Sequence, residues 1–272
     1  AQWGQVRDAQ GGWRDGPALP HVDAATQRDR LTYWDNSLVQ LAAIPRTALS
    51  AEGKVNAAVF EQIVTTLADE VRFATYEAPL NSDTFFWSGL YPRMGGFQTE
   101  QAYRDYVQRL AQLPRYFAEH QANMRAGLAR GYSVPFVSLQ GRERSLEAYL
   151  AAGEDNPFWS PIAAMPAQWS QALKRELQAE AREVISAAVV PAYTDLLRFM
   201  REEYLPHTRR TLAARDLPNG DAFYQAQIRN FTTLDLNAEE IHQIGLAEVA
   251  RIRAEMDAVR ASTGFDGDMQ AF

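Results

Sequence analysis

The stretch PAQWSQALKRELQAEAREVISAAVVPAYTDLLRFMREEYLP, residues 166–206, decides the fold class. Its apolar side chains recur mostly at intervals of three or four, which places them on one face of an α-helix. The stripe consists of Trp169, Leu173, Leu177, Ala181, Val184, Ala188, Leu196 and Phe199. Pro191 lies inside this pattern, and Pro206 closes it. We therefore expect a long helix that bends at Pro191 and ends at Pro206.

Helical patterns also fill most of the remaining chain. Segments that begin with a capping residue are 23–45, 50–78, 99–131 and the segment from Asn237, where Glu240 completes a capping box. Pro114 kinks residues 99–131, which are expected to form a helical hairpin or one bent helix. Arg144–Ala152 is expected to form a short helix, whereas Val134–Leu139 is the only segment typical of a strand. The sequence thus predicts a mainly α protein in which long, kinked helices pack as an irregular array.

Two regions differ in their organisation. Residues 1–22 are rich in glycine and proline and show little periodicity, so they are expected to form a loose N-terminal arm. Residues 23–272 are expected to form one helical lobe. Within it, the aromatic segment Asn81–Trp87 and the glycines that follow predict a structured loop with buried rings.

Composition and charge exclude several classes of protein. A 46% hydrophobic share and a 22% charged share are typical of a folded globular chain and argue against disorder. The net charge of -7, with basic residues scattered among acidic ones, disfavours nucleic-acid binding. No apolar run reaches the roughly 20 residues of a membrane span. The absence of cysteine excludes disulfides, thiolate ligands and a cysteine nucleophile.

The start of the chain suggests a compartment. The first residue is Ala1 rather than an initiator methionine, as in a mature protein after signal-peptide cleavage. We therefore expect an exported protein, periplasmic or secreted, although a start point chosen within a longer protein would look the same.

The histidines do not form a metal-binding motif. His21, His120, His207 and His242 are far apart, so the HExxH helix, in which two histidines four residues apart bind zinc beside a glutamate base, is absent. His120 lies on an apolar face and is expected to be a half-buried, hydrogen-bonded histidine. We assign no catalytic residue and no metal ligand to this chain.

A polar stretch around the last capped helix is the best candidate for ligand binding. Arg229, Thr232 and Thr233 precede that helix, and His242 lies in its first turns beside Glu239. Arginine holds carboxylates through bidentate hydrogen bonds, so these residues are candidates for substrate binding. The alternative is that they only cap helices and order a loop.

Several segments together resemble a known bacterial family. They are Leu110–Phe117, Asn123–Gly131, Val190–Tyr193 and Thr232–Val249. In this order they are similar to the family called domain of unknown function 885, from about residue 23 to residue 272. The resemblance implies a protein roughly twice this length, with two helical halves that enclose a deep cleft, as in zinc peptidases. It also implies that the zinc-binding HExxH helix lies in the second half, so that this chain is the N-terminal half only.

The resemblance leads to a functional hypothesis. We expect the chain to form the N-terminal scaffold and substrate-cleft half of a zinc-dependent metallopeptidase-like hydrolase, inactive without the C-terminal half. That half and a peptide substrate are the expected partners, and zinc is expected in the C-terminal half, with no cofactor bound by this chain. The alternative is a non-catalytic helical module that binds a peptide or a protein and is complete as it stands. A complete module should leave few large apolar patches exposed, whereas half of a larger fold should expose a broad apolar face.

Overall fold

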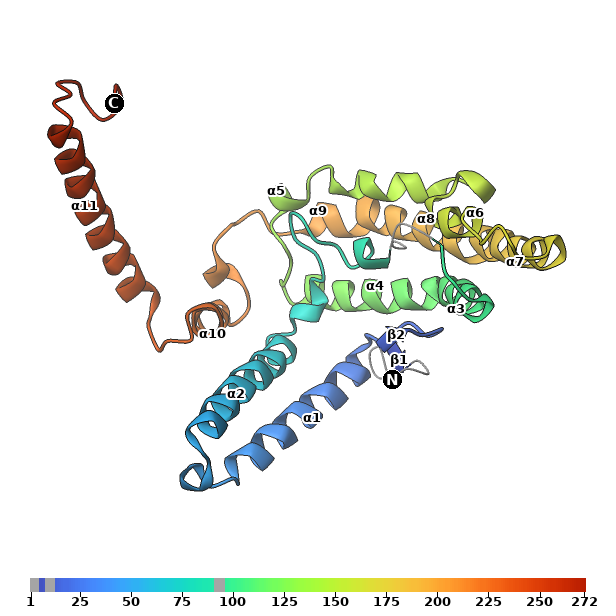
Figure 1. The fold of residues 1–272 in the computed structure, drawn as a ribbon, viewed down its shortest axis with the longest axis horizontal. Helices are drawn as coiled ribbons and strands as arrows, with labels where there is room; N and C mark the ends of the chain where they lie inside the picture. Colours follow the sequence, from blue (N-terminus) through green and yellow to red (C-terminus); the bar gives the residue numbers. More distant parts are fainter. Residues whose placement is uncertain (1–4, 8–12, 91–95) are drawn as a thin grey trace.

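The computed structural model describes residues 5–7, 13–90 and 96–272, and this part of the chain is mainly helical, as expected (Figure 1). Residues 1–4 and 8–12 of the predicted arm lie outside the described residues, as do residues 91–95 of the glycine-containing loop. The strands and α-helices are β1 (Gln5–Arg7), β2 (Trp13–Asp15), α1 (Ala24–Ala42), α2 (Ala51–Arg72), α3 (Glu100–Leu110), α4 (Leu113–Ala129), α5 (Phe136–Leu139), α6 (Ser160–Ala163), α7 (Gln171–Val184), α8 (Val190–Phe199), α9 (Leu205–His207), α10 (Gly220–Thr232) and α11 (Ala238–Ser262).

Short tight turns join these elements. The 3-10 turns are η1 (Arg46–Ala48), η2 (Thr75–Glu77), η3 (Ser88–Leu90), η4 (Arg142–Leu150), η5 (Gly153–Asp155), η6 (Pro157–Trp159) and η9 (Ala214–Asp216), and the π turns are η7 (Ile185–Val189) and η8 (Met200–Tyr204).

The long helix predicted around Pro191 is continuous from α7 through α9. The π turn η7 precedes Pro191, and the π turn η8 precedes Pro206. A proline lacks an N–H donor, and its ring crowds the carbonyl four residues earlier, so a wider turn relieves the conflict without ending the helix. The helix ends at His207, directly after Pro206, as the pattern predicted. It begins at Gln171, later than the sequence indicated, because the Ser170 hydroxyl caps it there.

The hydrophobic core lies where α3 and α4 face the α7–α9 helix, with η4 and η6 closing one side (Figure 1). Tyr193 of α8 is at its centre. Its ring meets Phe117 of α4 at 4.9 Å in an edge arrangement and stacks on Tyr149 of η4 at 4.4 Å between centroids. The Tyr106 hydroxyl donates a hydrogen bond to the Phe158 carbonyl at 2.7 Å. These contacts tie segments that are far apart in the sequence into one body.

The predicted helix caps are confirmed. Asp23, Ser50 and Thr99 accept backbone N–H groups in the first turns of α1, α2 and α3. At α11 the Asn237 side chain accepts the Glu240 N–H at 2.9 Å, and the Glu240 carboxylate accepts the Asn237 N–H at 2.8 Å. This is the complete capping box that the sequence predicted.

The strand prediction for Val134–Leu139 is wrong. Phe136–Leu139 instead forms the short helix α5, because Pro135 at its N-cap has no N–H to donate to a neighbouring strand. The Phe136 N–H donates to the Arg209 carbonyl at 2.9 Å rather than to a neighbouring strand. The strands in the described residues are β1 and β2, which pair antiparallel with Gln5 opposite Asp15.

Residues 16–22 do not behave as a loose arm. Leu19 and Val22 are buried, with exposed fractions of 7% and 8%. The Leu19 N–H donates to Gln112 Oε1 at 3.2 Å, and the Val22 N–H donates to Glu119 Oε2 at 2.8 Å. Gln112, directly before α4, and Glu119, on α4, therefore hold this segment, although its own sequence carries no helical or strand pattern.

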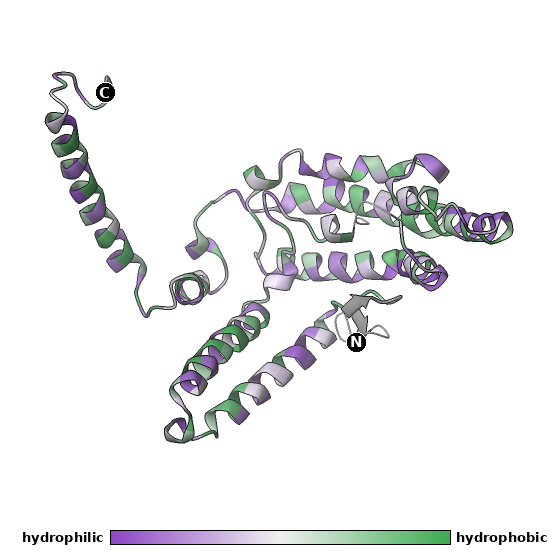
Figure 2. Ribbon diagram, in the orientation of Figure 1, coloured by the Kyte–Doolittle hydropathy of each residue, from purple (hydrophilic) through white to green (hydrophobic). Residues whose placement is uncertain are grey.

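Two parts project from the body, namely the α1–α2 hairpin and α11 (Figure 1). Figure 2 shows apolar residues along both. Phe60 and Ile63 belong to the stripe predicted for α2, but they are 48% and 53% exposed, whereas Val64 is buried at 2%. Only part of the stripe is covered, because α1 and α10 contact α2 along part of its surface. In the described part of the chain, no helix has the length and apolarity needed to cross a bilayer.

Candidate functional site

The predicted site residues do not gather in one pocket. Arg229 is exposed on α10, and its carbonyl accepts the Gln62 amide of α2 at 3.3 Å and the Thr233 N–H at 2.9 Å. The Thr232 hydroxyl donates to the Ile228 carbonyl at 2.7 Å, and Thr233, with a φ of 59°, is the C-cap residue of α10. His242 is exposed on α11. The threonines therefore serve the local helix end, which is the alternative that the sequence left open.

Arg229 does line a small cavity between α10 and α2. The cavity has a volume of about 110 Å³ and includes Asn230 and Thr66 in its wall. The Thr66 hydroxyl already donates to Asn230 Oδ1 at 3.0 Å. This hydrogen bond holds α10 against α2. The remaining space of about 110 Å³ leaves little room for a substrate.

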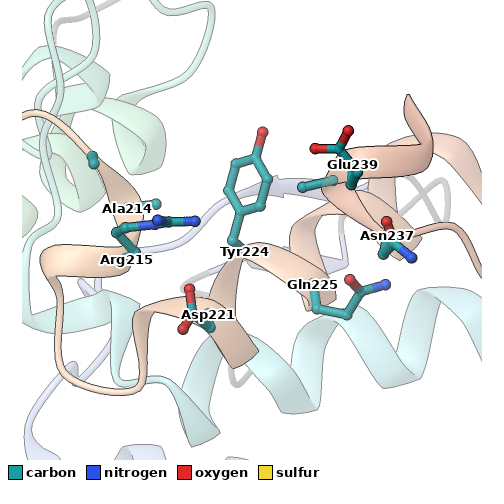
Figure 3. Close-up of a pocket in the computed structure, with 9 residues that line it drawn as sticks. Ala214, Arg215, Asp221, Tyr224, Gln225, Asn237 and Glu239 are labelled. Atoms are coloured by element: carbon teal, nitrogen blue, oxygen red, sulfur yellow. The ribbon is translucent and has the colours of Figure 1, made fainter. Parts of the chain in front are cut away.

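A larger pocket opens on the other side of α10. It has a volume of about 640 Å³ and is bounded by η9, the first turns of α10 and the start of α11 (Figure 3). Its lining consists of Ala213, Ala214, Arg215, Asp221, Tyr224, Gln225, Asn237, Ala238 and Glu239. None of the four predicted residues belongs to this lining, so the candidate site lies beside the predicted position.

A close backbone approach shapes the first wall of this pocket. A Cβ on Gly220 would lie 2.2 Å from the Ala214 carbonyl oxygen and 2.7 Å from Arg215 Cα, so only glycine fits. The preceding Asn219 has a φ of 56°, in the left-handed region that asparagine tolerates. The turn η9 therefore sits directly on the first turn of α10, and this contact sets Arg215 beside Asp221.

The segment that leads into η9 is fastened to the body. The Arg209 guanidinium donates to the Ser133 carbonyl and to the Ala213 carbonyl, both at 2.9 Å. The Ser133 hydroxyl accepts the Arg209 N–H at 2.9 Å. The first wall is therefore anchored to the chain that precedes α5.

The second wall is the capped start of α11. The Gln225 amide of α10 donates to the Leu236 carbonyl at 2.7 Å and holds the linker just before the cap. Glu239, in the first turn of α11, lines the pocket, and its Oε1 accepts the Gln243 amide at 2.8 Å. The Tyr224 ring stands between Arg215 and Glu239 (Figure 3).

The pocket thus presents charges of both signs that remain available to a ligand. In the described part of the chain, Arg215 and Asp221 form no ion pair and no side-chain hydrogen bond. Tyr224 is 48% exposed and offers an apolar ring with a hydroxyl at its end. A guanidinium on one side, carboxylates near it and opposite it, and an aromatic ring between them suit a polar organic ligand better than a bare ion.

Comparison with known proteins shows to which family the chain belongs. The family described as "Bacterial protein of unknown function (DUF885)" matches residues 8–272. The chain belongs to the DUF885 family. No curated protein matches it. A solved structure described as "The crystal structure of the putative lipoprotein from Colwellia psychrerythraea" matches with a TM-score of 0.71 at 20% identity, over 93% of this chain and 46% of that chain. This likeness shows a shared fold, and the DUF885 chain spans about half of that protein's length.

Zinc does not fit the one three-residue group of potential ligands within the described residues. That group is His21, Asp23 and Glu119. Glu119 Oε1 lies 2.8 Å from His21 Nδ1, but the Arg115 guanidinium contacts the same two atoms at 2.9 and 3.1 Å. Asp23 already caps α1. A divalent cation would have to displace a guanidinium and a helix cap, so we assign no metal step to the DUF885 chain's own residues.

This group acts instead as a latch between residues 16–22 and α4. Burial opposes ionisation of Glu119, but hydrogen bonds from the Val22 N–H, Arg115 and His21 outweigh it and lower the pKa of that carboxyl. The backbone N–H of Thr26 likewise lowers the pKa of Asp23. The carboxylates of Glu119 and Asp23 are therefore ionised and hydrogen-bonded at neutral pH.

The burial and hydrogen bonding of His120 differ from those that the sequence predicted. It is 6% exposed rather than half-buried, and neither ring nitrogen has a hydrogen-bond partner in the described part of the DUF885 chain. Burial lowers its pKa to about 4. The residue packs in the body, away from the residues that line the large pocket.

Pocket residues Arg215, Asp221 and Tyr224 were missed by sequence reasoning. The available signal was Asn219-Gly220, a pair typical of a tight turn, directly before a helix. It indicates where α10 begins but not that η9 folds back onto it.

Proposed function

We propose that residues 23–272 form the scaffold and substrate-cleft lobe of a zinc-dependent metallopeptidase-like hydrolase. The zinc ion, its ligands and the general base would come from sequence outside this chain, and the lobe alone would be inactive. The main support for a further part of the protein that packs on this lobe comes from α11. This helix has 25 residues, and none of them is buried.

The uncovered face of α11 is apolar along its length. Ile244, Val249, Ile252, Met256 and Val259 are between 45% and 59% exposed. Covering a half-exposed aliphatic side chain contributes about 1 kcal/mol. A face of this kind supports a further layer of protein packed against it.

The comparisons support a longer protein with this fold. The solved neighbour is about twice as long as the part that this chain matches. That neighbour is described as a "putative lipoprotein", which supports our expectation that the present protein is exported. The peptidase activity itself rests on the resemblance drawn from the sequence, and peptide is the proposed substrate class.

The exposed faces also bear on the alternative, a non-catalytic helical module that is complete as it stands. Such a module should cover most of its large apolar side chains. Here α11 and the α1–α2 hairpin both leave theirs exposed. The lobe is therefore the better interpretation.

The test compares this chain with a longer polypeptide that continues beyond residue 272. We expect the longer polypeptide to cleave peptides at a rate that a chelator abolishes, and to slow amide hydrogen exchange in α11 by at least about tenfold. We expect this chain alone to cleave nothing and to bind no stoichiometric zinc. Chelator-sensitive cleavage by the 272-residue chain would overturn the proposal, as would equal exchange of α11 in both polypeptides.

A further inference from the structure

The pocket between η9, α10 and α11 has a property that the lobe proposal does not require. Its two sides differ in charge. Arg215 lies on one side of Tyr224, and Glu239 lies on the other (Figure 3). Asp221 lies in the first turn of α10, near Arg215.

We propose that this pocket binds a short peptide through both of its charged ends, with the carboxylate at Arg215 and the ammonium group at Glu239. The inference rests on the proposed function in taking a peptide as the ligand. It adds the site, the orientation and the requirement for free ends.

The charge pattern selects a ligand that carries both signs. A guanidinium donates two parallel hydrogen bonds to a carboxylate, which fixes its orientation. An anion without a positive group would meet Asp221 and Glu239 unfavourably, and a cation without a negative group would meet Arg215 unfavourably. Glu239 keeps Oε2 for an ammonium group, because the Gln243 amide occupies only Oε1.

The volume and the aromatic lining of the pocket suit a tripeptide. Its volume of about 640 Å³ lies in the range of small-molecule sites. The half-exposed ring of Tyr224 offers apolar contact to a central side chain between the two charged ends.

The walls are ordered before any ligand arrives. Gly220 places η9 directly on α10, and Arg209 fastens η9 to the body. Gln225 and the capping box hold the start of α11. Pre-ordered walls lower the entropic cost of binding a small ligand.

The experiment measures the affinity of the 272-residue chain for the tripeptide Ala-Leu-Ala by NMR titration. The probe is compared with its N-acetylated and C-amidated forms. We expect each blocked form to bind about three- to tenfold more weakly, the range for solvent-exposed charged contacts. The backbone resonances of η9 and of the first turn of α11 should shift.

Variants of Arg215 and Glu239 test which end of the peptide each residue binds. Arg215→Ala should weaken binding of the free peptide about three- to tenfold and leave the C-amidated form unchanged, because the lost partner is then already absent. Glu239→Gln should behave in the same way toward the N-acetylated form. Arg253→Ala, on α11 but outside the pocket, is the matched control and should change nothing. All these side chains are exposed, so circular dichroism and melting temperature should match those of the wild-type chain.

Three results would overturn the inference. The first is equal affinity for free and blocked peptides, and the second is no binding of any of them. The third is equal loss on Arg215→Ala for free and amidated peptides. None of these results bears on the lobe proposal, which is tested by hydrogen exchange of α11 and by hydrolysis in the longer polypeptide.

Discussion

The imidazole of His120 stacks on the ring of Phe86, with centroids 4.0 Å apart and planes 19° from parallel. The ring of Tyr116 meets the imidazole edge-on at 4.6 Å. Burial holds the pKa of His120 at about 4, well below the ordinary value of 6.5. A protonated imidazole would have no hydrogen-bond acceptor within the described residues, so the folded protein keeps this side chain neutral.

We predict that His120 makes the folded state sensitive to mild acid. The unfolded chain takes up a proton at His120 as the pH falls through about 6.5, whereas the folded chain does so only near pH 4. The contribution of neutral His120 to the free energy of unfolding is therefore fully present above pH 6.5 and falls as the pH drops toward 4. At pH 4.5 the loss is about 2–3 kcal/mol. Urea unfolding at pH 7 and pH 4.5 measures this loss.

The variant His120→Phe separates this effect from that of the carboxylates. It keeps an aromatic ring between Phe86 and Tyr116 but cannot be protonated. We expect its free energy of unfolding to fall less than that of the wild-type chain between the two pH values. The same fall in both proteins would show that His120 does not control acid sensitivity.

Glu119→Gln should release residues 16–22 from α4. The substitution removes the charge that holds the Val22 N–H, His21 and Arg115, while it preserves the size of the side chain. We expect a loss of about 1–2 kcal/mol and faster hydrogen exchange in residues 19–22. Because the pKa of Glu119 is lowered in the folded state, this stabilisation is present above pH 4.5 and fades as the pH falls below it.

A matched control for the latch is Glu154→Gln. Glu154 also pairs with an arginine, Arg182, but both side chains are about half exposed or more. Exposed pairs contribute little, so this variant should unfold within about 0.5 kcal/mol of the wild-type chain. Equal effects at the two positions would contradict the latch.

Local features of the fold could be predicted from the sequence because their causes are local. Asp23 caps the helix that directly follows it, and Asn237 and Glu240 lie within one turn of each other. Pro191 acts on its own helix, where the π turn η7 lies just before it. These caps and turns each involve residues within a few positions of one another.

Features set by distant contacts could not be predicted. Val134–Leu139 has the composition of a strand, but Arg209, more than 70 residues later, accepts the Phe136 N–H and leaves no strand partner. Arg229 lies on the same helix as several residues of the open pocket, yet it lines the small cavity beside α2, whereas Arg215 lines the open pocket. Which side of α10 faces open space depends on the tertiary packing of α2, which no pattern within α10 encodes.

Gly220→Ala should disturb the first wall of the pocket. Its Cβ would lie 2.2 Å from the Ala214 carbonyl oxygen, so η9 would have to move. We expect a destabilisation of about 2 kcal/mol, and changed resonances for Arg215. The control is Gly245→Ala on α11, where a Cβ meets nothing within 4 Å. That change should strengthen the helix by up to about 1 kcal/mol. Equal stability of the Gly220→Ala and Gly245→Ala variants would show that η9 moves aside without a loss of stability.

The apolar face of α11 predicts how the isolated chain behaves in solution. Two such faces can cover each other, so we expect the 272-residue chain to self-associate at tens of micromolar or above, as sedimentation velocity would show. Ile252→Asp places a charge at the middle of the face and should give a monomer. Ala254→Asp, on the opposite side of the helix, introduces the same charge and lowers helix propensity at least as much, and this variant should still associate. In both variants the melting temperature of the body should stay unchanged, because no residue of α11 is buried. A monomeric wild-type chain at these concentrations, or association that survives Ile252→Asp, would show that this face is not a docking surface.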